Sequence, residues 1–219
     1  MPLAPGETEE EPLLAALRGL PPGSEVILVR ADPVPRGRPA GWPTGIAFRE
    51  VETERGRARQ MNAGARAARG RWLWFLHADT RFTPATLPAL RSFLAHGEAA
   101  MGWFDLAFRR DGPPLARLNA WGANRRSAWL GLPFGDQGLV LPSTEFARLG
   151  GYDEAARYGE DHLLVWAAHR SGLPLRRIGA GLSTSARKYA RHGWGATTWL
   201  HWRLTAAQAW GEWWRIRRG

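Results

Sequence analysis

Short apolar runs alternate with amphipathic segments along most of the chain. The continuous apolar run at 25–29 is typical of a strand buried on both faces, and residues 71–76 form the strongest run of this kind. Segments 56–68 and 160–171 instead space their small and apolar residues as a helix does. This alternation predicts an α/β fold with a mixed, mostly parallel sheet flanked by helices. Further strands are expected at 46–51, 99–108, 138–141 and 173–185, and further helices at 12–17, 83–96, 113–130, 143–149 and from 188 onward.

The composition is that of a globular protein with one main domain. Of 219 residues, 44% are hydrophobic and 23% are charged, and cysteine is absent, which excludes a disulfide framework and a thiolate metal site. We assign 1–190 to the domain and 191–219 to a tryptophan-rich helical extension. Residues 1–12 are acidic without the apolar core of a signal peptide, and no run approaches the ~20 apolar residues that span a bilayer. We therefore expect a cytoplasmic protein, or one resting peripherally on the inner face of the membrane.

The chain carries a formal charge of +10, and Lys188 is the only lysine among its 30 basic residues. The arginines are spread over different predicted elements and form no single stripe, which argues against nucleic-acid binding. The same positive charge suits an anionic substrate, such as a nucleotide diphosphate or a lipid phosphate.

Candidate chemistry begins where the strongest strand ends. Asp79 follows that strand, and in open α/β sheets ligands bind beyond the carboxyl ends of the strands. A carboxylate there can hold Mg²⁺ or Mn²⁺, or it can simply cap a turn before Thr80. The segment 56–64 enters a helix with small residues and the donors Arg57 and Asn62, which fit a phosphate or an ordinary solvent-exposed face equally well.

Two further polar segments follow later in the chain. Glu160 and Asp161 open a helix, where the helix dipole alone stabilises acidic residues, but Asp161 can also serve as a general base. Asp136 and Gln137 lie in a glycine-spaced loop and can bind hydroxyl groups or act as turn residues.

Taken in order, these segments resemble family 2 glycosyltransferases over residues of about 25 to 195. Within that family the chain is most similar to a small bacterial branch labelled as arsenosugar-biosynthesis-type glycosyltransferases. The segments that carry the resemblance are Gly56-Arg57…Gln60-Met61-Asn62…Gly64, Phe75-Leu76-His77-Ala78-Asp79-Thr80, Gly131-Leu132-Pro133-Phe134-Gly135-Asp136-Gln137-Gly138, Gly150-Gly151-Tyr152, Glu160-Asp161 and Thr184-Ser185-Ala186-Arg187.

The resemblance implies a GT-A fold and an inverting transfer of a sugar from a nucleotide-sugar donor to a hydroxyl acceptor, which can be lipid-linked. Asp79 would bind the metal, Mg²⁺ or Mn²⁺, in an Asp-x-Asp-like motif whose first position is His77 here. Asp161 would be the general base, oriented by Glu160. The remaining implied positions are Arg57, Gln60, Asn62, His77, Ala78 and Arg187 on the donor side, and Gly135, Asp136 and Gln137 on the acceptor side.

The chain departs from the family pattern at the nucleotide side. Residues 1–7 leave almost no room for the usual first strand, and Arg30-Ala31-Asp32-Pro33 replaces the aspartate and small-residue turn that follow the second strand. A truncated first strand leaves an exposed edge, which favours a homodimer. The alternative function is therefore a non-catalytic GT-A-like protein that acts in binding or at a membrane surface.

The C-terminal segment repeats tryptophan at helical spacing. Trp199, Trp202, Trp210 and Trp213 fall on one stripe, with arginines at 215, 217 and 218 behind them. Two interpretations remain open. The stripe packs on the domain or on a second subunit, or it lies on a membrane with the arginines toward anionic lipid.

Overall fold

The computed structural model describes residues 1–4, 6 and 8–218, and for 191, 192, 201, 202, 212, 213 and 215–218 it describes the backbone only. The predicted tryptophan stripe therefore falls partly outside the described side chains, at Trp202, Trp213 and the three arginines after them. The helices are α1 Glu10–Leu17, α2 Arg57–Ala67, α3 Thr86–Ala95, α4 Ala116–Leu130, α5 Ser143–Arg148, α6 Glu160–Arg170, α7 Arg187–His192 and α8 Trp194–Arg218, with a 3₁₀ turn, η1, at Gly135–Gln137. The strands are β1 Pro2–Leu3, β2 Glu25–Arg30, β3 Ala47–Glu52, β4 Trp72–Trp74, β5 Arg81–Phe82, β6 Met101–Phe108, β7 Val140–Pro142 and β8 Leu175–Thr184.

The strands form two sheets. The small sheet has the order β1-β2-β3 with parallel pairing throughout, and the large sheet has the order β4-β7-β6-β8-β5. In the large sheet β6 and β8 run parallel, whereas the short strands β4, β5 and β7 pair antiparallel. Most paired residues belong to the three parallel ladders, as the sequence predicts.

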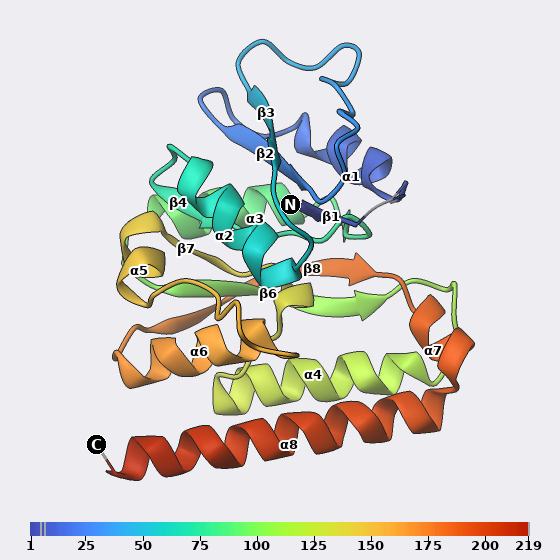
Figure 1. The fold of residues 1–219 in the computed structure, drawn as a ribbon, viewed down its shortest axis with the longest axis vertical. Helices are drawn as coiled ribbons and strands as arrows, with labels where there is room; N and C mark the ends of the chain where they lie inside the picture. The colour runs from blue at the N-terminus through green and yellow to red at the C-terminus, as the bar shows by residue number, and fades with distance from the viewer. Residues whose placement is uncertain (5, 7, 219) are drawn as a thin grey trace.

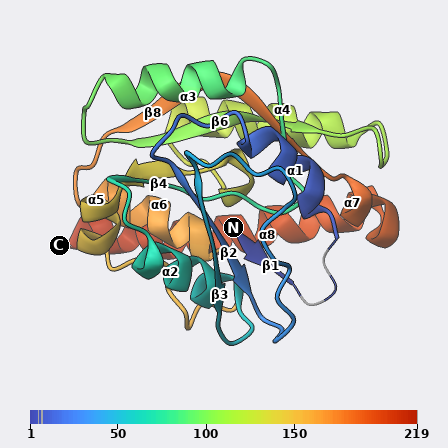
Figure 2. The ribbon, with the colours of Figure 1, turned by 90° about the horizontal axis from the view of Figure 1, so that it is seen from above.

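Helices cover the large sheet on two sides. Figure 1 shows α6, α4 and α8 beneath it and the small sheet above, and Figure 2 shows α3 and α1 on the side away from α2. One apolar cluster packs α2 and α6 against the large sheet around Phe75, Phe146 and Tyr152. A second cluster joins the two sheets through residues that include Leu28 and Phe104. These two clusters hold in place the loops that follow β4 and precede β7 and α6.

The predicted elements are found, with differences at short segments. The strand predicted over 71–76 is regular only over the three residues of β4, and the helix predicted from 188 is divided at Gly193 into α7 and α8. The two-residue strand β5 was not predicted. α3 begins at Thr86 rather than at 83, after a turn in which the Thr83 backbone N–H donates to the Thr86 hydroxyl. β1 has two residues, which pair in parallel with Val29 and Arg30 of β2.

The C-terminal helix packs along the domain. Asn119 of α4 donates to the Thr198 hydroxyl of α8 at 2.9 Å and accepts from the Trp194 indole at 3.0 Å. Thr197 is buried, whereas Trp199 and Trp210 remain exposed. None of the described helices is both long and apolar enough to cross a bilayer.

Candidate functional site

The site is built around Asp79, in the loop that follows β4. Its Oδ2 accepts hydrogen bonds from the Thr184 hydroxyl at 2.6 Å and from the Ser185 backbone N–H at 3.1 Å. These donors lie at the carboxyl end of β8, so the loop after β4 and the segment before α7 are held together. Oδ1 of Asp79 takes part in none of the hydrogen bonds found among the described residues. One oxygen of Asp79 is thus fixed to the fold by the segment before α7.

Asp161 lies at the start of α6, and the backbone holds both of its oxygens. Oδ2 accepts from the Gly135 N–H at 2.5 Å, and Oδ1 accepts from the His162 N–H at 2.9 Å. Burial by itself would raise the pKa of the Asp161 carboxyl, but the Arg57 charge and these two N–H groups outweigh burial and lower that pKa below its usual value. Asp161 is therefore ionised at neutral pH.

Arg57, in the first turn of α2, connects the two regions. Its Nε lies 3.1 Å from Glu160 Oε1, and its Nη2 lies 3.7 Å from Asp161 Oδ2. The same Nη2 lies 2.6 Å from Nε2 of His77. Burial, and next the Arg57 charge, lower the pKa of His77 to about 3, so its ring is neutral and accepts this hydrogen bond. The Arg57 guanidinium thus connects His77, two residues before Asp79, with Glu160 and Asp161 at the start of α6.

Asp136 adds a second carboxylate next to Asp161. Its Oδ1 is buried without a hydrogen-bond partner in the described part of the chain. Burial, and next the Asp161 charge, raise the pKa of Asp136 to about 6, although Arg57 and Arg126 act in the opposite direction. The Arg126 guanidinium lies 3.6 Å from the centre of the Phe134 ring, at the edge of the same loop. Asp136 is therefore a carboxyl group that can hold a proton near neutral pH.

Lys188, the only lysine, also belongs to this region, and the sequence analysis did not assign it a role. Burial lowers the pKa of its ammonium, and the charges of Asp136, Arg57 and Asp161 all act on it. The signal in the sequence was its position directly after the Thr184–Arg187 segment. Arg187 forms an ion pair with Glu9, the residue directly before α1, at 2.7 Å between Nη2 and Oε1.

Four of the predicted binding residues are engaged in the interior. Gln60 donates to the carbonyls of Leu3 at 2.7 Å and Val29 at 2.8 Å, so its amide fastens β1 to β2. Asn62 exchanges hydrogen bonds with the backbone of Tyr152. The side chains of Ala78 and Gln137 are buried, and the Gln137 amide donates to the Phe104 carbonyl. These four residues therefore pack in the interior next to the site, where the three amides hold the surrounding backbone in place.

A buried ion pair lies at the end of β2, on the side where the family resemblance implies the nucleotide. Arg30, at the end of β2, places its Nε 2.6 Å from Glu50 Oε2 and its Nη1 3.5 Å from Asp32 Oδ1. The Arg30 side chain is 6% exposed, so its charge is matched inside the fold. Asp32 also contacts Arg30 in this network. It lies near the position at which the family resemblance implies an aspartate that contacts the nucleotide base.

The fold is similar to that of known proteins. The family model "Glycosyl transferase family 2" matches residues 39–140, a little under half of the chain. The structure of TarS 1–349 from S. aureus has a TM-score of 0.60 and 14% identity, over 84% of this chain and 58% of that one. The same fragment in complex with UDP-GlcNAc has a TM-score of 0.60 and 14% identity, over 84% and 56%.

A third solved structure is similar over more of this chain. It is the mannosyltransferase PcManGT from Pyrobaculum calidifontis in complex with GDP-Man and Mn²⁺, with a TM-score of 0.59 and 21% identity, over 94% of this chain and 59% of that one. This chain spans a little over half the length of these structures. No curated protein matches it. The chain has the GT-A fold of nucleotide-sugar-dependent glycosyltransferases.

Proposed function

We propose that the chain is an inverting, metal-dependent glycosyltransferase that moves a sugar from a nucleotide-sugar donor to a hydroxyl acceptor. The observation that carries this proposal is the position of Arg57, whose guanidinium contacts both His77, beside Asp79, and the Glu160–Asp161 pair. The fold and the match to the glycosyltransferase family 2 model over residues 39–140 support it. The arsenosugar-type branch and the domain boundary at 190 stay predictions from the sequence.

The residues around Asp79 fit a divalent cation that arrives with the donor. Mg²⁺ and Mn²⁺ at diphosphate sites need only one or two carboxylates, because phosphate oxygens and water complete the shell. Asp79 Oδ1 would be the protein ligand, and among the described residues no group of three acidic or histidine side chains forms a cage of its own. When bound, the cation would neutralise charge on the diphosphate leaving group.

The proposed reaction is a direct displacement at the anomeric carbon. The acceptor oxygen forms a bond to that carbon while the bond from the carbon to the diphosphate oxygen breaks, and the hydroxyl proton passes to a carboxylate. Asp161, kept ionised by Arg57 and two backbone N–H groups, is the proposed proton acceptor, with Glu160 fixing Arg57 beside it. Asp136 and the Gly135 backbone would face the acceptor, while Arg57, Lys188 and Arg187 would add positive charge near the donor phosphates.

Thermal shift with nucleoside diphosphates tests the donor site. We expect UDP or GDP to raise the melting temperature only with Mn²⁺ present, because a ligand that binds the native state stabilises it by mass action. Asp79→Asn should remove the Mn²⁺-dependent part, while the matched change Asp153→Asn, on an exposed loop, should keep it. If no nucleoside diphosphate with Mn²⁺ shifts the transition, the proposal fails.

One observation favours the alternative function, a non-catalytic GT-A-like binding protein. The buried Arg30–Glu50 pair and the two-residue β1 occupy the nucleotide side, where the family has an aspartate and a full strand. Under this alternative, Glu50→Gln would change stability but no nucleotide would bind to either form. Transfer of sugar from UDP- or GDP-linked donors to any hydroxyl acceptor, detected by mass spectrometry, would exclude it.

A further inference from the structure

A tryptophan-rich surface lies on the outer sides of α4 and α8. All five tryptophans whose described side chains are exposed belong to these two helices, and Trp129 and Trp199 are 72% and 70% exposed. We call this surface the tryptophan face. Its exposed apolar members are Leu115, directly before α4, Leu118, Trp121, Trp129 and Leu130 of α4, and Trp199, Leu200, Trp210 and Trp214 of α8.

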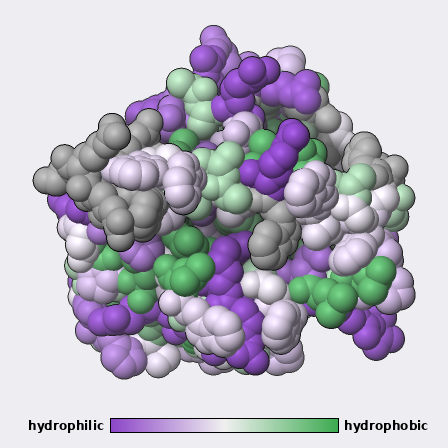
Figure 3. Space-filling model, turned by 90° about the horizontal axis from the view of Figure 1, so that it is seen from below, coloured by the Kyte–Doolittle hydropathy of each residue, from purple (hydrophilic) through white to green (hydrophobic). Residues whose placement is uncertain are grey.

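The two helices present this face together. Asn119 connects α4 to both Thr198 and Trp194 of α8, so the helices are direct neighbours below the large sheet (Figure 1). On α4, Leu118, Trp121 and Trp129 are three and eight positions apart, and on α8, Trp199, Trp210 and Trp214 are eleven and four positions apart. Such spacings keep side chains on one side of a helix. Figure 3 views the molecule from below, where pale and green groups alternate with purple hydrophilic ones.

Arginines are interleaved with the tryptophans. The Arg125 guanidinium lies 5.3 Å from the centre of the Trp121 ring and 5.0 Å from that of Trp129, so it is stacked between the two rings. Arg117 and Arg203 are exposed on the same two helices. Indole rings favour the boundary between hydrocarbon and water, and arginine favours anionic headgroups. The face therefore combines the two groups that hold a protein at an anionic lipid surface.

We propose that the tryptophan face binds the surface of an anionic lipid bilayer, with α4 and α8 lying in the headgroup layer. The charge of the chain, +10, is complementary to such a surface. A second copy of the chain is a poorer occupant, because a two-fold contact would oppose this arginine-bearing face to itself. Binding to lipid does not depend on the proposed transferase activity.

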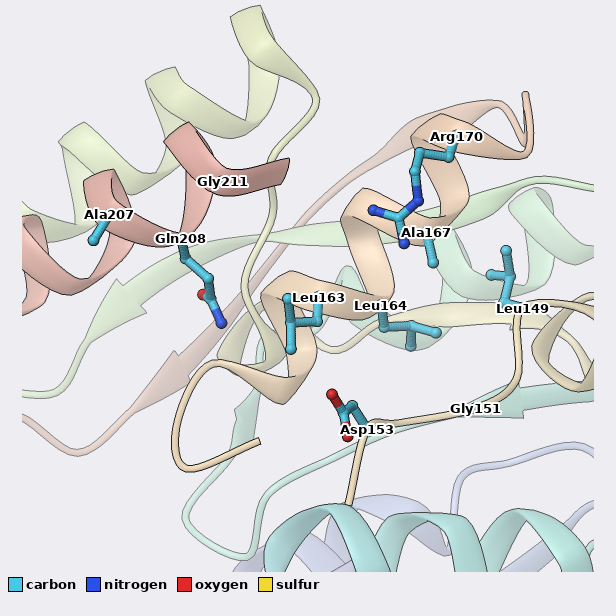
Figure 4. A pocket seen from close by; sticks show the side chains of 10 residues that line it. All are labelled: Leu149, Gly151, Asp153, Leu163, Leu164, Ala167, Arg170, Ala207, Gln208 and Gly211. Atoms are coloured by element: carbon cyan, nitrogen blue, oxygen red, sulfur yellow. The ribbon is translucent and has the colours of Figure 1, made fainter. Parts of the chain in front are cut away.

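The inner sides of the same helices contact the site. On α4, Ser127 donates to the Gln137 side chain at 2.8 Å, which supports the acceptor-side loop. On α8, the Gln208 amide donates to the Tyr158 and Gly159 carbonyls directly before Glu160, beside a cavity of about 400 Å³ between α6 and α8 (Figure 4). A bilayer under the tryptophan face would thus lie one helix away from the loops that face the acceptor.

Vesicle flotation of the full chain tests this proposal. We expect flotation with equimolar phosphatidylcholine and phosphatidylglycerol, little with phosphatidylcholine alone, and a decrease at high salt as the charges are screened. Arg125→Glu with Arg203→Glu should weaken binding at least about tenfold, because each arginine near an anionic surface contributes of the order of 1 kcal/mol. The control Arg55→Glu with Arg69→Glu changes the net charge equally on exposed positions away from α4 and α8, and it should weaken binding much less.

A second variant separates lipid insertion from charge alone. Trp129→Ala with Trp210→Ala leaves the charge unchanged and should also reduce flotation about tenfold, with the melting temperature measured to confirm folding. Equal losses in the two arginine variants, or no loss in the tryptophan variant, would overturn the proposal. Failure of the wild type to float with the anionic vesicles would also overturn it. Dimerisation, or binding to single-stranded RNA that the tryptophan variant abolishes, would then assign the face to a second copy or to a nucleic acid.

Discussion

The backbone N–H of Gly135 donates a hydrogen bond to Oδ2 of Asp161 at 2.5 Å, across 26 positions of the sequence. This contact joins the acceptor-side loop to the first turn of α6, and it leaves no room for a larger residue. A Cβ at position 135 would stand 2.7 Å from Asp161 Oδ2 and 2.8 Å from Arg57 Nη2. The glycine therefore sets the distance between the loop and the proposed base.

Gly135→Ala should lower transfer activity at least about tenfold, because misplacement of a catalytic group by a fraction of an ångström is costly. The control is Gly122→Ala, in the middle of α4, where a Cβ meets nothing within 4 Å. That change should leave activity intact and raise stability slightly through helix propensity. Steady-state kinetics and thermal melts of both variants measure the contrast, and equal activities would show that the close approach at Gly135 is unimportant.

Arg57→Ala should reduce kcat/KM about a hundredfold, a typical cost for removing a fixed charge at a site of this kind. Since the Arg57 charge lowers the pKa of Asp161, its removal raises that pKa. The acidic limb of the pH–rate profile should therefore move to higher pH. Arg59→Ala, two positions along the same helix, is the control, and a profile that stays in place in Arg57→Ala would contradict the assignment of Asp161 as the base.

Asp136→Asn should stabilise the protein at pH 7 by up to about 3 kcal/mol, the equivalent of a two-unit pKa shift. The folded-state pKa of Asp136 is raised to about 6 from 3.8, so the native state binds more protons than the unfolded state between these values. Asp136 therefore costs stability progressively as the pH rises from about 4 to 6, and the full cost remains above that range. Asp161, Arg57, Arg126, Asp79 and Lys188 are the charged groups that surround it.

Chemical denaturation of the wild type and Asp136→Asn across this pH range tests that sign. The two stabilities should converge near pH 4 and diverge above it. The opposite result is that Asp136→Asn loses stability relative to the wild type as the pH rises from 4 to 7. That result would mean that the fold stabilises the Asp136 carboxylate.

The sequence predicts the regular elements well where hydrophobic period and length agree, as in β2, α2 and α6. The sequence does not predict which polar side chains are used inside the fold and which ones face the site. Gln60 and Arg57 lie three positions apart on α2, yet the Gln60 amide is buried against β1 and β2 while Arg57 faces the acidic pair. Only the packing of α2 on two sheets decides this difference.

Gln60→Ala should destabilise the chain by about 1–3 kcal/mol, because the buried carbonyls of Leu3 and Val29 lose their donor. If Gln60 acts only through the fold, the affinity of the variant for a nucleoside diphosphate at low temperature should stay within about twofold of the wild type. Loss of a direct contact worth about 1.4 kcal/mol would instead lower that affinity about tenfold. Isothermal titration and denaturant melts provide the two measurements. A loss of affinity without a loss of stability would instead favour direct contact with the donor, the role that the family resemblance implies.

Gln208→Ala should lower kcat while changing the free energy of unfolding only slightly. Its amide bonds to the carbonyls of Tyr158 and Gly159, which directly precede Glu160 and Asp161, so the start of α6 loses its support from α8. Gly211→Ala on the same helix, where a Cβ meets nothing within 4 Å, serves as the control. Equal kinetics in both variants would mean that α8 does not support the site.

The separation of the strands into two sheets has a consequence for cooperativity. No backbone ladder connects β1, β2 and β3 to the large sheet in the described part of the chain. The two are joined by side-chain packing and by hydrogen bonds such as those from the Arg69 and Gly70 backbone N–H groups to Glu25 of β2. Fraying of the small sheet therefore breaks no hydrogen bond of the larger one. Opening of the small sheet would instead expose the apolar side chains that the two sheets share, such as Phe104 and Leu182, so their packing sets how far the two parts can separate.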